Sequence, residues 1–231
     1  MTAALLDEVI EELYASHTSD AEAAAAARRD YEQRRGKVHQ DDELWEAWSA
    51  AFVEWYVVER VGDDGMPPAA RTARALLAGD PKRDVVAALI TSQRSLFEVR
   101  GISKGRVELL DLLGGAVFVV EEKRSLHGVE VGDVAELRLV GVGGEVRFGR
   151  TFVYHPKAAR GAIVERARAM LGQGASRRDV IDQIAQLRVQ VTRYRHMPAA
   201  RVYELGARPK DPKEELSRGR RDELPPRGST G

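Results

Sequence analysis

The sequence contains no cysteine, only 6% aromatic residues, and no apolar run long enough to span a bilayer. The lack of cysteine excludes disulfides, thiolate zinc sites, iron–sulfur clusters and cysteine nucleophiles. A membrane-spanning helix needs roughly 18 to 20 consecutive apolar residues, so we expect no membrane association of this kind. Acidic side chains occupy the first residues where a signal peptide carries basic ones. We therefore expect a cytoplasmic protein.

The charge is balanced overall but unevenly distributed. The 231 residues hold 36 basic and 36 acidic side chains, and 43% of them are hydrophobic, which is typical of one large or two small globular domains. Residues 1–150 hold 19 basic and 27 acidic side chains, whereas residues 151–231 hold 17 and 9. The two parts therefore carry −8 and +8. Arginine outnumbers lysine 29 to 7, which we interpret as the codon bias of a GC-rich bacterial genome.

Residues 1–91 are predicted to form a helical domain. Apolar residues recur at helical spacing over 3–35, with Asp20 preceding an alanine-rich stretch, and a continuous stripe containing all three tryptophans runs from Leu44 to Tyr56. We interpret this stripe as core. Glycine and tandem proline in 62–68 end this helix, and two shorter helices are expected over 69–78 and 82–91.

The period changes from 3.6 to 2 near Ser92, which predicts a sheet over residues 92–156. Tight glycine-bearing turns without intervening helices favour an antiparallel arrangement, and we expect closure into a small β-barrel because closure removes exposed edges. The predicted fold class is therefore α+β. The five expected strands are Leu96–Ile102, Arg106–Leu112, Ala116–Glu121, Val134–Val140 and Val146–Tyr154.

A helical module is predicted over residues 157–206. Two apolar stripes separated by the turn 172–174 indicate a helical hairpin, Ser176 and Asp179 resemble a capping box, and a short element is expected over 199–205. Residues 207–231 have no periodic apolar residues and are predicted to be a disordered basic tail.

No catalytic motif or metal-ligand spacing is present. The five histidines show no metal-binding pattern, and the sequence contains no nucleophile elbow, Walker loop or dinucleotide fingerprint. We therefore predict no metal, no cofactor and no enzymatic activity. The alternative is an enzyme without a familiar motif, which would use Asp111 or Asp133 with His155.

Arginines are the candidate binding residues, because clustered cations attract polyanions and release their counterions. The alternative is that they form a solvated face or pair with the acidic part of the same chain. The candidates in the basic region are Arg166, Arg168, Arg177, Arg178, Arg188, Arg193, Arg195 and Arg201, and those on the predicted barrel are Arg94, Arg100, Arg147 and Arg150.

The stretch from Ser95 to Pro156 resembles a small β-barrel segment that uncharacterised bacterial proteins flank with helices. The resemblance lies in the segments 111–115 (Asp-Leu-Leu-Gly-Gly) and 131–133 (Val-Gly-Asp) and implies no activity. The layout also resembles a PilZ barrel, whose family binds cyclic di-GMP through an Arg-x-x-x-Arg and an Asp/Asn-x-Ser-x-x-Gly motif.

The match to the PilZ motifs is incomplete. With Asp111 on the first position of the second motif, Leu113 stands in place of serine and Ala116 in place of glycine. Arg94 and Arg100 are more widely separated than the arginine pair of that family. The resemblance implies a cyclic-dinucleotide sensor, or a degenerate barrel kept for protein contacts.

The combined sequence evidence predicts a non-enzymatic regulatory or adaptor protein. Its basic C-terminal region would bind nucleic acid or an acidic protein partner, and a homo-oligomer is possible. A cyclic-dinucleotide sensor and an enzyme without a recognisable motif are the alternatives.

Overall fold

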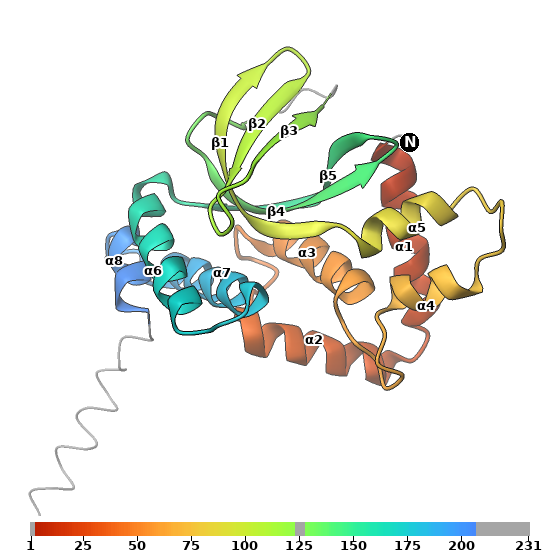
Figure 1. Cartoon of the computed structure of the whole chain (residues 1–231). Coiled ribbons are helices and arrows are strands. Elements are labelled where there is room, and N and C mark those ends of the chain that lie inside the picture. Colours follow the sequence, from red (N-terminus) through yellow and green to blue (C-terminus); the bar gives the residue numbers. More distant parts are fainter. Residues whose placement is uncertain (1–2, 123–127, 207–231) are drawn as a thin grey trace, which may run out of the picture.

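The computed structural model describes residues 3–122 and 128–206, which form eight α-helices and one five-stranded antiparallel sheet (Figure 1). The predicted α+β class is confirmed. The helices are α1 (Ala3–His17), α2 (Ala21–Arg35), α3 (Trp45–Val58), α4 (Pro68–Ala75), α5 (Arg83–Ile90), α6 (Arg160–Gly172), α7 (Arg177–Arg193) and α8 (Ala199–Leu205). A 3₁₀ turn, η1 (Lys157–Ala159), precedes α6.

The strands follow the predicted period-2 segments closely. They are β1 (Gln93–Ser103), β2 (Arg106–Asp111), β3 (Val117–Glu121), β4 (Val134–Val142) and β5 (Glu145–His155), in the spatial order β3-β2-β1-β4-β5. Gly105 closes the short β1–β2 turn with a φ of 73°, a left-handed conformation that favours glycine.

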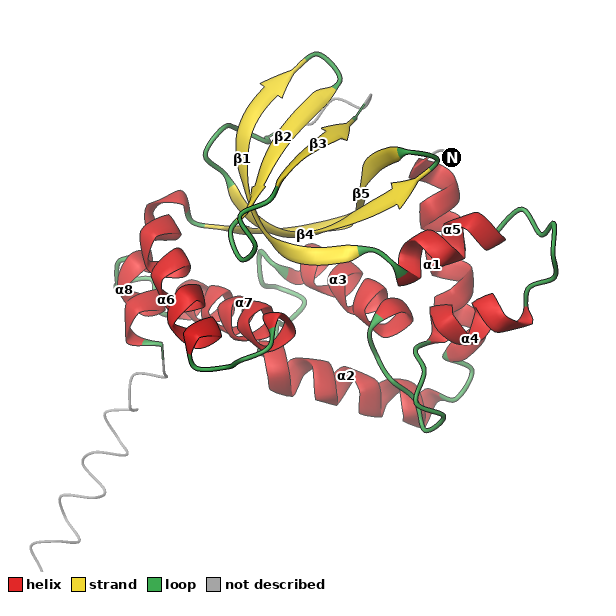
Figure 2. Cartoon of the chain, in the orientation of Figure 1, coloured by secondary structure: helices red, strands yellow, loops and turns green. Residues whose placement is uncertain are grey.

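The sheet is strongly curved but open, so the expectation of a closed barrel is wrong (Figure 2). The strands β3 and β5 are its two edges, and no pairing joins them among the described residues. Helices, and not barrel closure, bury the outer face of β4 and β5. In addition, β3 has only five residues, and a short edge strand offers little backbone for unwanted pairing.

Helices α1 to α5 form one hydrophobic cluster against the outer face of β4 and β5. The tryptophan stripe lies in this cluster, as predicted: Trp48 is fully buried, and Trp55 packs 5.3 Å from the Tyr31 ring. The segment 3–35 forms two helices because the Asp20 side chain accepts hydrogen bonds from the amides of Glu22 and Ala23 and so caps α2.

Two further clusters use the rest of the sheet. Helices α6 to α8 pack on its outer face around Leu96 and Val134, and the concave face encloses an apolar core that includes Phe97, Leu109 and Phe148. The predicted cap is confirmed, since Ser176 Oγ accepts from the Asp179 amide at the start of α7. The predicted disordered tail lies outside the described residues. None of the helices described is both long and apolar enough to cross a bilayer.

Candidate functional site

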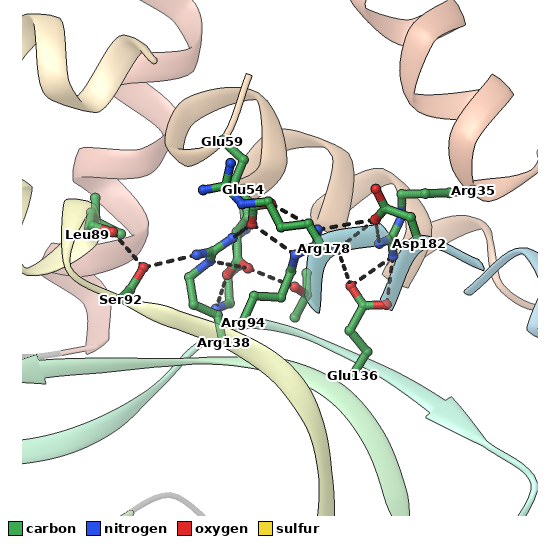
Figure 3. A network of polar contacts seen from close by, with 12 residues as sticks. Arg35, Glu54, Glu59, Leu89, Ser92, Arg94, Glu136, Arg138, Arg178 and Asp182 are labelled. Carbon is green, nitrogen blue, oxygen red and sulfur yellow. Dashed lines mark hydrogen bonds and ion pairs between the residues drawn. The ribbon is translucent and has the colours of Figure 1, made fainter. Parts of the chain in front are cut away.

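Charged side chains are buried where the sheet meets the helices (Figure 3). Side chains alternate along β4, so Ala135, Leu137 and Leu139 enter the concave core while Glu136 and Arg138 point toward the helices. They meet charged groups from four other elements. We call the following set the ionic network: Arg35, Glu54, Glu59, Arg94, Glu136, Arg138 and Asp182.

Arg35 joins α2 to both the sheet and α7. Its guanidinium donates to the Glu136 carboxylate at 2.7 and 2.8 Å and to Asp182 Oδ1 at 2.8 Å. The Tyr31 and Trp48 rings lie 5.1 and 5.2 Å from the Arg35 Cζ atom. The side chain is only 1% exposed, and two carboxylates and two aromatic faces compensate its lost hydration.

Arg94 on β1 contacts three carboxylates. It donates to both Glu59 oxygens at 2.9 Å, to Glu136 at 3.0 Å and to Asp182 at 3.1 Å. Bidentate pairing of this kind fixes the geometry of both groups. The barrel-face candidate Arg94 is therefore a link between α3, β4 and α7.

Glu54 on α3 and Glu59, the residue directly after it, have pKa values shifted in opposite directions. Arg94 and Arg138 hold the pKa of Glu59 at about 2 despite its burial. Burial instead raises the pKa of Glu54, whose carboxylate accepts from the Arg150 amide and from Thr151 Oγ1.

Two cavities border this network, and both are lined by Glu59 and Arg178. The smaller one, of about 240 Å³, lies between the end of α3, the start of β1, β4 and the start of α7. Four arginines line it, namely Arg94, Arg138, Arg177 and Arg178. The larger one, of about 410 Å³, lies between α2, α3 and α7 and has mixed charge.

The structure brings together three of the arginines that were singled out from the sequence. Arg94, Arg177 and Arg178 line the 240 Å³ cavity. Arg177 donates to Asp111 Oδ2 at 2.6 Å, whereas Arg178 is 66% exposed and its nearest acid, Glu59, is 3.7 Å away. Asp111 also accepts from Ser95 and Gln93.

The other candidates in the C-terminal region are dispersed. Arg166 and Arg188 reach the backbone oxygens of Gly206 and Tyr154, and Arg188 also pairs with Glu43. The exposed members of the set have the following partners: Arg193 donates to Lys37 O, Arg195 to Thr192 O and Arg201 to Glu204, whereas Arg168 has no described partner.

The remaining candidates on the sheet pair locally or with α1. Arg100 pairs with Glu98, Arg147 with Glu145 and Arg150 with Glu11. The PilZ resemblance would require Arg94 and Arg100 to converge on one site, and they do not.

The three residues of the alternative enzyme hypothesis, Asp111, Asp133 and His155, contact different partners. Asp133 pairs with Lys157, and His155 Nδ1 lies 2.8 Å from the Tyr203 hydroxyl. Burial lowers the pKa of His155 to about 3. None of the three groups, Asp111 included, lines either of the two cavities described above.

Sequence reasoning missed most of the ionic network, since Arg94 is its only member that was singled out from the sequence. Arg177 and Arg178, which were also singled out, lie next to the network. One signal was available in α3, where Glu54 is the only charged residue between Glu46 and Glu59. A carboxylate at such a position is buried in the core and needs a partner.

Residues 4–187 match the profile of a family of unknown function, DUF7986. No curated protein and no solved structure matches the chain.

Proposed function

Since this chain belongs to that family, which carries no activity to transfer, we propose from its own residues that it is a non-enzymatic regulatory or adaptor protein. In this proposal the arginines of the C-terminal helices contact an acidic partner, either nucleic acid or an acidic polypeptide surface. The guanidinium group suits both, because it donates two parallel hydrogen bonds to a phosphate or a carboxylate.

One observation carries the proposal. Arg168, Arg193 and Arg195 are exposed, and none has a carboxylate within ion-pair distance in the part of the chain that the structure describes. Buried arginines such as Arg35 and Arg94 are neutralised by the chain's own acids. The three exposed cations keep their charge available to a partner, and they lie in the region 151–231, whose net charge is +8, which supports a contact through α6 and the segment at the end of α7.

The test is fluorescence anisotropy with three labelled probes, namely duplex DNA, single-stranded RNA and polyglutamate, at about 50 and 200 mM salt. We expect saturable binding to at least one probe. The triple variant Arg168→Gln, Arg193→Gln, Arg195→Gln should weaken that binding at least tenfold and reduce its salt dependence, because three phosphate or carboxylate contacts are lost.

The matched control removes the same charge from the N-terminal half, through Arg29→Gln, Arg74→Gln and Arg83→Gln, all at exposed positions. Its affinity should stay within about twofold of the wild type, since surface charges at a distance are screened. Equal losses in the two triple variants, or no binding to any probe, would contradict the proposal.

A further inference from the structure

The 240 Å³ cavity differs from the rest of the molecule in the charge of its walls. Four guanidinium groups line it, and Glu59 is the only carboxylate among its lining residues. The remaining walls are apolar or neutral: Val58, Ile90, Ser92, Gln93 and Ile181. Cations from β1, β4 and α7 therefore converge on one small space.

Two of these arginines are fixed in place. Arg94 and Arg138 are 9% and 2% exposed, and each pairs with Glu59. Arg138 also donates to Ser92 Oγ at 3.0 Å and lies 3.6 Å from Glu54. Arg94 already donates five hydrogen bonds, to Glu59, Glu136 and Asp182, which is as many as a guanidinium can make, so it forms a wall of the cavity. The donors for a bound group therefore come from Arg138, whose position is set, and from the two arginines at the opening.

The other two arginines stand at the opening. Arg177 is held by Asp111 and is 41% exposed, while Arg178 is 66% exposed. The carboxylate nearest to Arg178 is Glu59, which already accepts hydrogen bonds from Arg94 and Arg138. Arg178 thus lacks a hydrogen-bonded acid of its own among the described residues, and its charge faces the cavity that it lines.

The size of the cavity limits the ligand. Pockets for drug-sized molecules begin at about 300 Å³, so this cavity suits a small group. A phosphate group presents several acceptor oxygens and up to two negative charges, which matches several guanidinium donors better than a single carboxylate does.

We propose that this cavity binds a phosphate group, either the free ion or the terminal phosphate monoester of a larger molecule, with Arg178 and Arg177 closing over it. The site is separate from the surface proposed above, which uses Arg168, Arg193 and Arg195. Either proposal can therefore fail without the other.

The experiment titrates the isotopically labelled full chain with sodium phosphate, phenyl phosphate and sodium acetate at constant ionic strength, and records amide chemical shifts. We expect saturable shifts with phosphate at residues 90–94 and 176–181, and at least tenfold weaker binding of acetate. Saturation by phosphate but not phenyl phosphate identifies the free ion as the ligand. Saturation by both shows that a terminal monoester is accepted.

The deciding variant is Arg178→Gln, which alters a mostly exposed side chain and leaves the buried network intact. It should weaken phosphate binding at least tenfold. Arg74→Gln, which removes an exposed arginine of α4 away from the cavity, should change the binding by less than twofold. Equal weakening by the two substitutions, or no saturation at about 20 mM phosphate, overturns the proposal.

Discussion

Glu54 on α3 and Glu59, the residue directly after α3, are both buried, yet their surroundings shift their pKa values in opposite directions. Glu59 has Arg94 and Arg138 as close partners, so its charge is compensated. Glu54 has only Arg138 at 3.6 Å, and its other partners are a backbone amide and a hydroxyl. Burial therefore dominates at Glu54 and raises its pKa, while the guanidinium groups dominate at Glu59.

This contrast predicts unequal effects of the same substitution. Glu59→Gln leaves two buried guanidinium groups without their acid and should lower the free energy of unfolding by about 3–5 kcal/mol. Glu54→Gln removes a carboxylate with one arginine at 3.6 Å and leaves one of its two donors without an acceptor, so it should cost less, about 1–2 kcal/mol. Urea unfolding at pH 7 measures both. Equal losses in the two variants would contradict this account of the network.

The pH dependence of stability follows from the same pair of groups. The pKa of Glu59 is about 2 in the folded chain against an ordinary value of 4.5, so the unfolded chain takes up the proton first as the pH falls. The stabilisation by Glu59 is present above about pH 5 and is lost as the pH falls toward 2. At about 1.4 kcal/mol per pKa unit it amounts to about 3 kcal/mol.

We therefore expect the difference in unfolding free energy between the wild type and Glu59→Gln to shrink by about 3 kcal/mol from pH 5 to pH 2. The measurement is urea unfolding of both proteins at a series of pH values. A difference that stays constant over this range would show that Glu59 does not titrate as described.

At the scale of elements, Gly149 on β5 packs tightly against both β4 and α3. A Cβ atom at this position would lie 3.0 Å from Arg138 Cβ and Glu54 Oε1, and 3.1 Å from the Arg138 carbonyl oxygen. Glycine therefore lets β5 run next to the charged side chains of β4 and α3. At the same place, the Arg150 amide and Thr151 Oγ1 donate hydrogen bonds to the Glu54 carboxylate.

Gly149→Ala should lower the free energy of unfolding by about 1–3 kcal/mol, because the added methyl group forces these neighbours apart. Gly141→Ala on β4 is the matched control, since no atom lies within 4 Å of its would-be Cβ and its φ is not left-handed. Thermal unfolding compares the two. Similar midpoints for both variants would show that the space around Gly149 is not limiting.

The secondary structure could largely be predicted from the sequence because hydrophobic periodicity is a local property. The alternation over Val134–Val140 predicted β4, and the tryptophan stripe predicted α3. The same alternation does not say what covers the second face of β4. Helices cover it, and so Glu136 and Arg138 are buried.

The candidate site was predictable only in part, because its contacts join distant parts of the chain. Arg35 and Asp182 are 147 positions apart, and Arg94 and Glu136 are 42 apart. Nothing in the local pattern of either partner indicates such a pair. Arg177 and Arg178 were candidates because basic residues are in excess after position 150. That excess does not reveal which arginines are neutralised by acids elsewhere in the fold.

At the scale of the whole molecule, the ionic network connects the helical N-terminal part to the C-terminal helices through the sheet. Asp182 on α7 accepts from Arg35 on α2 and from Arg94 on β1, and α7 also packs along α2. All three tryptophans lie on α3, in the hydrophobic cluster of α1 to α5 that also includes Ala185 and Val189 of α7. A substitution in α7, followed by the tryptophan fluorescence of α3, therefore tests whether the predicted module 157–206 unfolds independently of the rest of the chain.

We expect Asp182→Asn to lower the urea midpoint seen by tryptophan fluorescence and the one seen by circular dichroism by the same amount, because both arginines that lose their partner lie outside α7. Glu165→Gln, an exposed change on α6, is the control and should leave both midpoints unchanged. If the dichroism instead shows a separate, earlier transition while the fluorescence midpoint stays in place, the C-terminal helices unfold as a unit of their own, and the network does not couple them to the rest of the chain.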